Sequence, residues 1–181
     1  MTTMLWMLMF AIVAAALFAW RRRCGLGVGE LAFRPRELLG ARLVYMEQQF
    51  RSGGPIPLVA RLDRAYRLPN GRIVLVELKT RWADRAYPSD IIQLSAQKHA
   101  LESHTGEVVE PYAFVTVLRP IRRRRWKAHR VKLLDSGQLF ALARRREEIL
   151  AGRLAPTYAA SARACIGCEF RARCDRYDAR G

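Results

Sequence analysis

The sequence predicts an α/β domain, a central mixed β-sheet flanked by helices, preceded by one transmembrane helix. The first observation behind this is an unbroken apolar run from Met4 to Trp20, followed at once by three arginines. The second is that the periodic segments after this run alternate between helical and strand patterns. The roughly 155 residues that follow are enough for one domain with one core.

The apolar run predicts a membrane anchor. Its 17 residues, Met4 to Trp20, span roughly 25 Å as a helix, near the lower limit for crossing a bilayer. Basic residues follow the run and none precedes it, which is the reverse of a secretory signal peptide. By the positive-inside rule we expect residues 1–23 to anchor the chain in the inner membrane, with residues 24–181 facing the cytoplasm.

The first half of the domain is expected to contain a helix and a hairpin. Six apolar residues recur at helical spacing over residues 36–51, and a Gly/Pro break follows at residues 52–57. Residues 58–66 and 72–80 then have the composition of two strands.

The second half is expected to continue as helix, strand, strand and helix. Residues 91–103 and 137–152 have helical spacing, and the second of these ends at Gly152. Residues 111–118 are rich in Val, Phe and Tyr, as strands are, and residues 127–134 form a weaker strand pattern.

The turn between the two hairpin strands fixes their register. Pro69 and Asn70 suit the central positions of a type I turn, and Gly71 suits the left-handed position that follows. Leu68 then pairs with Arg72, so that the numbers of paired residues sum to 140.

This register predicts a cluster of charged side chains. Asp63 faces Glu77 with the Cβ atoms about 5 Å apart, and Lys79 lies on the same face. The opposite face is expected to be core, formed by Leu62, Val74, Val76 and Leu78.

Two facing carboxylates suit one or two Mg²⁺ or Mn²⁺ ions, which prefer oxygen ligands. A metal there would polarise a phosphodiester and lower the pKa of a bound water, and Lys79 would orient that water or stabilise negative charge. The alternative is a solvated strand face with a Glu–Lys surface pair.

The motif Asp63 … Glu77-Leu78-Lys79 resembles the D…(D/E)xK signature of the PD-(D/E)XK nuclease superfamily. Gln93, at the start of the next expected helix, resembles the glutamine of the QxxxY motif of the RecB-type branch. The resemblance implies a restriction-endonuclease-like fold, catalytic roles for Asp63, Glu77, Lys79 and Gln93, and metal ligation by Asp63, Glu77 and the backbone carbonyl of Leu78.

Two positions depart from the RecB-type pattern. Gln97 stands where tyrosine is usual, and the first expected helix carries no histidine. Glu47 on that helix is the nearest substitute metal ligand, and an exposed helix charge is the alternative for it.

Four cysteines predict a second metal centre. Cys165, Cys168 and Cys174 form C-x₂-C-x₅-C within the tail 155–181, and Cys24 precedes the domain. Four thiolates suit a 4Fe–4S cluster or Zn²⁺. One cysteine before the core and three after it resembles the iron–sulfur CRISPR-associated exonucleases, whose cluster ties the chain ends together. If Cys24 is not a ligand, His104 or Asp175 could replace it.

The charge balance favours a polyanionic partner, since 32 Lys and Arg against 16 acidic residues give a net charge of +16. The densest basic segment has DNA phosphates as its expected partner and an anionic membrane surface as the alternative. A tryptophan within it could stack on an unpaired base. The segment consists of Arg122, Arg123, Arg124, Arg125, Trp126 and Lys127.

Together these features predict a metal-dependent DNA nuclease, tethered to the membrane and acting on DNA ends or single strands. One alternative is a catalytically silent nucleic-acid-binding module with a structural Fe–S or zinc site. Another is a membrane-surface adaptor with a zinc site and no nucleic-acid partner.

Overall fold

The computed structural model describes residues 33–54, 57–120, 126–159, 162–166, 168, 169, 171 and 174. The chain divides into two units, residues 1–140 and residues 141–181. The first unit contains all the strands and the helix α2, and the second contains the end of α3 together with α4.

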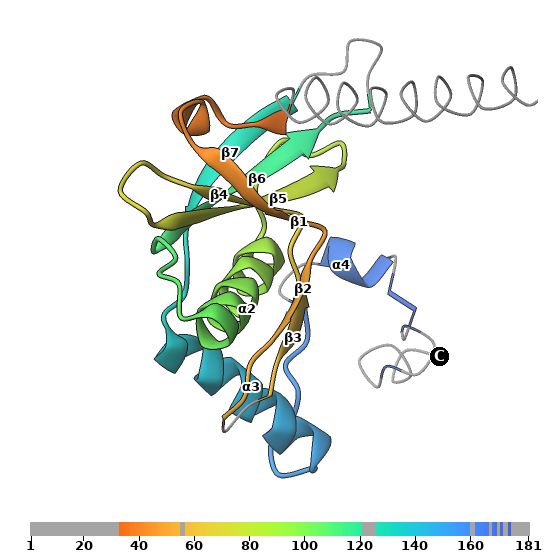
Figure 1. The fold of residues 1–181 in the computed structure, drawn as a ribbon. Helices are drawn as coiled ribbons and strands as arrows, with labels where there is room; N and C mark the ends of the chain where they lie inside the picture. The colour runs from red at the N-terminus through yellow and green to blue at the C-terminus, as the bar shows by residue number, and fades with distance from the viewer. Residues whose placement is uncertain are drawn as a thin grey trace, which may run out of the picture. The chain divides into compact units, whose positions relative to one another are not determined.

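A five-stranded sheet forms the centre of the first unit (Figure 1). Neighbouring strands run antiparallel except β5 and β6, which are parallel, so the α/β class with a mixed sheet is confirmed. In spatial order the strands are β1 (Arg42–Met46), β4 (Arg64–Arg67), β5 (Ile73–Thr80), β6 (Tyr112–Leu118) and β7 (Trp126–Lys132).

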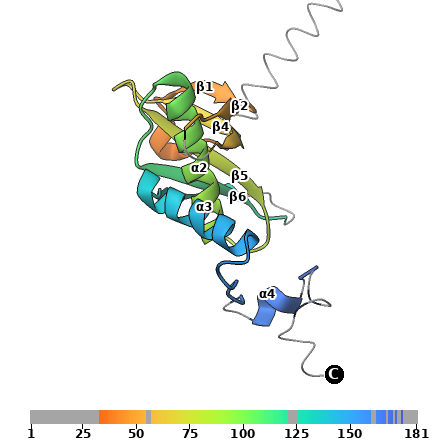
Figure 2. The ribbon, with the colours of Figure 1, turned by 90° about the horizontal axis from the view of Figure 1, so that it is seen from below.

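The helix α2 (Pro88–Thr105) connects the two parallel strands and lies against one face of the sheet (Figures 1 and 2). Its Leu94 and Leu101 join Leu75 of β5 and Val115 of β6 in the larger hydrophobic core. The opposite face of the sheet has a smaller core around Tyr66. The short 3₁₀ helix η1 (Arg36–Leu38) contributes Leu38 to that smaller core.

The predicted hairpin register is confirmed. The Gly71 N–H donates to the Leu68 carbonyl at 2.9 Å, and the Leu68 N–H donates to the Arg72 carbonyl at 2.8 Å. Gly71 has φ 84°, the left-handed value that the turn requires and that glycine adopts without a steric cost. The ladder then runs from Arg67↔Ile73 to Arg64↔Val76, so paired numbers sum to 140.

The predicted helix over residues 36–51 is wrong. The structure has η1 there, then β1, then β2 (Gln49–Arg51), which pairs with β3 (Val59–Arg61) in a separate two-stranded sheet. Pairing of β1 with β4 overrides the helical spacing, because it gives Leu43 and Tyr45 partners on an edge of the main sheet. Glu47, with φ 54°, separates the two strands.

The predicted position of Leu62 is also wrong. Leu62 is fully buried, but it lies in the core of the α2 face with Leu75, and Val74 and Val76 lie in the other core. The cause is a break between β3 and β4, because residues 62 and 63 belong to neither strand. Strict alternation of side chains therefore does not continue from the ladder to Leu62.

The remaining elements are close to their predicted ranges. Helix α2 and strands β6 and β7 lie where the periodicity placed them, and α3 covers Ser136–Leu150. Asp135 precedes α3, where its carboxylate accepts from the Gln138 N–H at 2.8 Å and its own N–H donates to the Gln138 side chain at 3.1 Å. In the second unit, α4 covers Ala162–Ile166.

The predicted transmembrane helix is wrong, and so is the inner-membrane localisation that was inferred from it. Across the part of the chain that the structure describes, no helix combines the length and apolarity needed to cross a membrane. The run from Met4 to Trp20 on which both predictions rested lies outside the described residues.

Candidate active site

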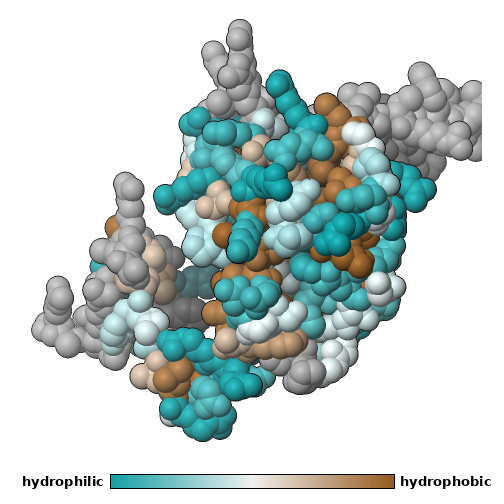
Figure 3. All heavy atoms as spheres, turned by 90° about the vertical axis from the view of Figure 1, so that its left-hand side faces the viewer, coloured by the Kyte–Doolittle hydropathy of each residue, from teal (hydrophilic) through white to brown (hydrophobic). Residues whose placement is uncertain are grey.

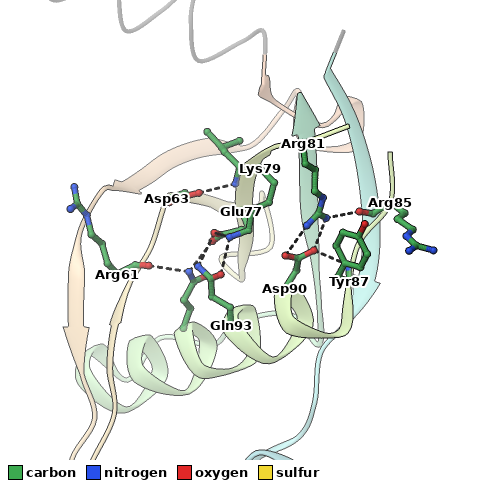
Figure 4. A network of polar contacts seen from close by, with 11 residues as sticks. Arg61, Asp63, Glu77, Lys79, Arg81, Arg85, Tyr87, Asp90 and Gln93 are labelled. Carbon is green, nitrogen blue, oxygen red and sulfur yellow. Dashed lines mark hydrogen bonds and ion pairs between the residues drawn. The ribbon is translucent and has the colours of Figure 1, made fainter. Parts of the chain in front are cut away.

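A buried carboxylate lies at the centre of the candidate site. Glu77 is in the middle of the sheet on β5, points towards α2 and is only 2% exposed. Oε1 accepts from the Lys79 ammonium at 2.7 Å and from the Gln93 amide at 2.7 Å (Figure 4). Oε2 accepts from the Gln97 amide at 2.9 Å. Burial with three donors excludes the alternative of a solvated strand face.

Helix α2 supplies two of these donors because Gln93 and Gln97 are one helical turn apart and therefore lie on the same face. The Gln93 carbonyl oxygen also accepts from the Lys79 ammonium at 2.9 Å, which closes a ring of Glu77, Lys79 and Gln93. Gln97 is buried, and its amide also donates to the Arg61 carbonyl at 2.9 Å, linking β3 to the site.

The first turn of α2 is fixed by a second polar group. Asp90 is 3% exposed and accepts two hydrogen bonds from the Arg81 guanidinium, at 2.6 and 3.2 Å. It also accepts from the Tyr87 N–H at 2.8 Å, which ties the carboxylate to the residue before the helix. Burial raises the pKa of Asp90, but the Arg81 and Tyr87 hydrogen bonds outweigh it and hold the pKa below its usual value. Figure 4 shows this group beside the Glu77 cluster.

Asp63 lies just beyond the last ladder pair of the hairpin. Its Oδ2 accepts from the Leu78 N–H at 2.8 Å, which brings the carboxylate to the β5 backbone next to Glu77. Burial raises the pKa of the Glu77 carboxyl, and the negative charge of Asp63 adds to the rise. Hydrogen bonds from Lys79 and Gln97 oppose it, but the net direction is upward.

The donor atoms in this cluster fit a hard divalent cation. A carboxylate offers about four acceptor positions. Donors occupy three of those of Glu77, two on Oε1 and one on Oε2, so one position on Oε2 remains. Asp63 has one donor from the backbone and further free positions. Within the described residues, no three His, Cys, Asp or Glu side chains are grouped to hold a metal ion. Backbone carbonyls or water would therefore complete the coordination.

Glu47 lies near Asp63 in the backbone but its side chain is directed elsewhere. Its N–H donates to the Asp63 carbonyl at 3.1 Å, whereas its carboxylate pairs with Arg61 at 2.7 Å. The Glu47 side chain is 55% exposed. The structure therefore does not bring this carboxylate to Glu77.

The basic segment is only partly described, because residues 121–125, including Arg122 to Arg125, lie outside the described residues. Lys127 pairs with Val117, which pairs with Lys79, so Lys127 lies on the same face of the sheet as the candidate site. By the alternation of side chains Trp126 lies on the other face. There it is half-buried and packs edge-on against Phe33, with ring centroids 4.3 Å apart.

The cysteines of the tail are close together in sequence within the second unit. The Cys168 N–H lies 3.4 Å from the Cys165 carbonyl, and Arg171 links Cys168 to Cys174 by backbone hydrogen bonds of 3.1 and 3.2 Å. Cys168 is exposed, and Cys165 and Cys174 are partly exposed. Cys24 and Asp175 lie outside the described residues. The ring of His104 packs against Phe50 in the first unit.

The raised pKa of Glu77 predicts a pH-dependent stability. The unfolded chain loses this proton first, so as pH rises between the ordinary and the raised pKa the folded state holds more protons and the free energy of unfolding falls. The variant Glu77→Gln has no carboxyl proton at this position, so this fall in the free energy of unfolding should be absent from it. In urea unfolding without divalent metal, we expect the variant to gain stability relative to wild type as pH rises from about 4 to 8. If the difference in free energy of unfolding between variant and wild type stayed constant across this range, it would contradict a raised pKa of Glu77.

Comparisons with known proteins place the chain in a family. Solved structures that the chain matches include SSO0001, at 19% identity over 92% of this chain and 71% of that one, with a TM-score of 0.48. Another is a candidate exonuclease from Eubacterium rectale, at 12% identity over 80% of this chain and 57% of that one, also with a TM-score of 0.48. Neither similarity carries an argument about function, and no curated protein matches. The model of the PD-(D/E)XK nuclease superfamily matches residues 11–175, and the chain therefore belongs to that superfamily.

Proposed function

We propose that the chain is a divalent-metal-dependent deoxyribonuclease that hydrolyses phosphodiester bonds at DNA ends or in single strands. The observation that carries this proposal is the buried Glu77 carboxylate, bonded to Lys79 and Gln93 and with Asp63 at the adjacent β5 backbone. Membership of a nuclease superfamily supports the class of reaction.

In this proposal Asp63, Glu77 and the Leu78 carbonyl hold Mg²⁺ or Mn²⁺. When bound, the ion supplies polarisation of the phosphodiester and a lower pKa for a coordinated water. The hydrolysis forms one bond between water oxygen and phosphorus and breaks one ester bond to the leaving oxygen. The water gives up a proton, and the leaving oxygen takes one.

Lys79 and Gln93 have separate roles. The Lys79 ammonium lies between oxygens of Glu77 and Gln93, so a fixed positive charge is available where the attacked phosphate gains negative charge. Gln93 donates to Glu77 and accepts from Lys79, which holds the two side chains in one orientation. Gln97 acts as a positioning residue because it holds the other oxygen of Glu77.

Charge supports DNA as the substrate. The net charge of +16 favours binding to a phosphate backbone without sequence preference. Hydrophilic side chains cover most of the described surface on the face that Figure 3 shows, with smaller apolar areas between them.

Cleavage of labelled DNA tests the proposed function. The full chain, purified without oxygen, should cut DNA with Mn²⁺ or Mg²⁺ and not with EDTA. Glu77→Gln and Lys79→Met should each lower the rate on the order of 10²-fold or more, because each removes charge from the reacting centre. Glu37→Gln is the control, since this exposed acid lies in η1 and pairs with Arg130.

Cutting that persists in EDTA or in Glu77→Gln would reject the proposed site. A folded protein that binds DNA and does not cut it would instead be the catalytically silent module.

We further propose that Cys165, Cys168 and Cys174 bind a 4Fe–4S cluster with Cys24 as the fourth ligand, or alternatively Zn²⁺. The spacing of the three tail cysteines in the sequence and the thiolate chemistry support this. The structure describes all three cysteines and does not group them around one metal position. The role of such a site would be structural.

Loss of one cysteine tests this second centre. Cys168→Ala should remove the bound metal and destabilise the fold by on the order of 10 kcal/mol, as structural metal sites can contribute. Metal analysis and absorbance distinguish iron with sulfide from zinc. The neighbouring exposed Glu169→Gln is the control. Unchanged metal content and unfolding midpoint in Cys168→Ala would reject the cluster.

A further inference from the structure

A tryptophan in the loop between β5 and α2 is largely exposed to solvent. Trp82 is 68% exposed, one of the most exposed large apolar side chains among the described residues. It belongs to the loop 81–87, which connects β5, the strand of Glu77 and Lys79, to α2, the helix of Gln93 and Gln97. Tryptophan has the largest apolar surface of any side chain, so a ligand that covered it would bury substantial area.

The loop holds Trp82 in a fixed place, because the residues around it are attached to the domain. On one side the Arg81 N–H donates to the Leu118 carbonyl at 3.1 Å and the Arg81 side chain binds Asp90. On the other side Asp84 binds His129 of β7 at 2.7 Å. Trp82 is therefore displayed by a short backbone segment with both ends fixed.

The last part of the loop is ordered by stacking. The guanidinium of Arg81 lies 4.4 Å and that of Arg85 4.8 Å from the centre of the Tyr87 ring (Figure 4). Arg85 itself is exposed. Its charge is available to a phosphate while its plane rests on the tyrosine.

Basic side chains lie close to the loop that carries Trp82. Sheet register places Lys79, Val117 and Lys127 in one row across β5, β6 and β7. Lys127 is 64% exposed and lies 3.4 Å from Asp84, two residues after Trp82. Proteins that bind single-stranded nucleic acid combine an exposed aromatic ring, which stacks on a base, with nearby cations that bind the backbone.

Trp126, which the sequence favoured for this role, is less suited to it. Its ring packs against Phe33 and it lies on the face of the sheet opposite Glu77. Trp82 lies three residues after Lys79, in the loop between β5 and α2, and its side chain is exposed to solvent.

We propose that Trp82 stacks on an unpaired base of the strand being cut, and so makes the chain prefer single-stranded or frayed DNA over intact duplex. In a duplex the faces of each base are covered by its neighbours, so a side chain beside the cleavage site can stack only after the base is freed. The inference rests on the proposed nuclease function, because it places the substrate strand at Glu77.

Binding to two labelled probes tests the inference. Oligothymidine and a blunt duplex of equal length are titrated with the full chain in EDTA, so that cleavage plays no part. Trp82→Ala should lose roughly five- to a hundred-fold affinity for oligothymidine, the range that one base–aromatic stack provides, with duplex affinity unchanged. Trp82→Phe should retain most of the affinity, and wild-type tryptophan fluorescence should be quenched on binding oligothymidine.

Leu39→Ala serves as the matched control, since this side chain is 62% exposed and lies next to η1. It should leave both affinities unchanged, and all variants should unfold at the wild-type midpoint. Equal losses on both probes in Trp82→Ala, no loss on either, or no binding of oligothymidine by the wild type would each overturn the inference.

Cleavage distinguishes this inference from the proposed function. If the wild type binds single strands through Trp82 but cuts nothing with Mn²⁺ or Mg²⁺, stacking is supported and the nuclease proposal fails. If the wild type cuts DNA and Trp82→Ala binds and cuts single strands as well as it does, the nuclease stands and stacking fails.

Discussion

The arrangement of the first unit depends on the burial of one carboxylate. An ionised carboxylate taken out of water loses on the order of several kcal/mol unless charge and hydrogen bonds replace its hydration. Here Lys79, Gln93 and Gln97 replace it, and two of the three come from α2. The register of α2 against β5 is therefore fixed by polar chemistry as well as by the core beneath it. The Arg81–Asp90 pair fixes where that helix begins.

Gln97 shows how the site departs from the pattern that the motif resembles. At the position where tyrosine is usual, this chain has an amide that is buried and donates to both Glu77 and the Arg61 carbonyl. An amide supplies these donors without an ionisable group of its own. Gln97 therefore gives the central carboxylate a hydrogen bond, and it also ties β3 to the site.

The hairpin could be predicted from the sequence because its register depends on local chemistry. A turn with Gly71 in the left-handed region permits one pairing, and that pairing brings Asp63 to the β5 backbone beside Glu77. The position of Gln97 beside Glu77 could also have been predicted, since Gln97 lies one helical turn after Gln93. The burial of Glu77 was not, because it results from the packing of α2.

The errors arose where long-range pairing decides the structure. Residues 36–51 have apolar residues at helical spacing, but β1 exists because β4 offers it hydrogen bonds. Leu62 lies in the core on the α2 face, not in the predicted one, because residues 62 and 63 interrupt the strand structure between β3 and β4. Trp126 was placed with Lys127 by sequence, whereas strand alternation puts adjacent residues on opposite faces. Trp82 was missed because only the structure distinguishes an exposed tryptophan from a buried one.

The proposed function depends on a metal site that Glu77 and Asp63 form together. The most direct measurement is calorimetric titration of Mn²⁺ into the full chain without DNA, compared with Asp63→Asn, Glu77→Gln and the control Glu37→Gln. We expect Mn²⁺ to bind the wild type and the control, and to bind each of the other two variants at least about tenfold more weakly, because each loses a negatively charged ligand. Equal Mn²⁺ affinity in all four proteins would contradict it.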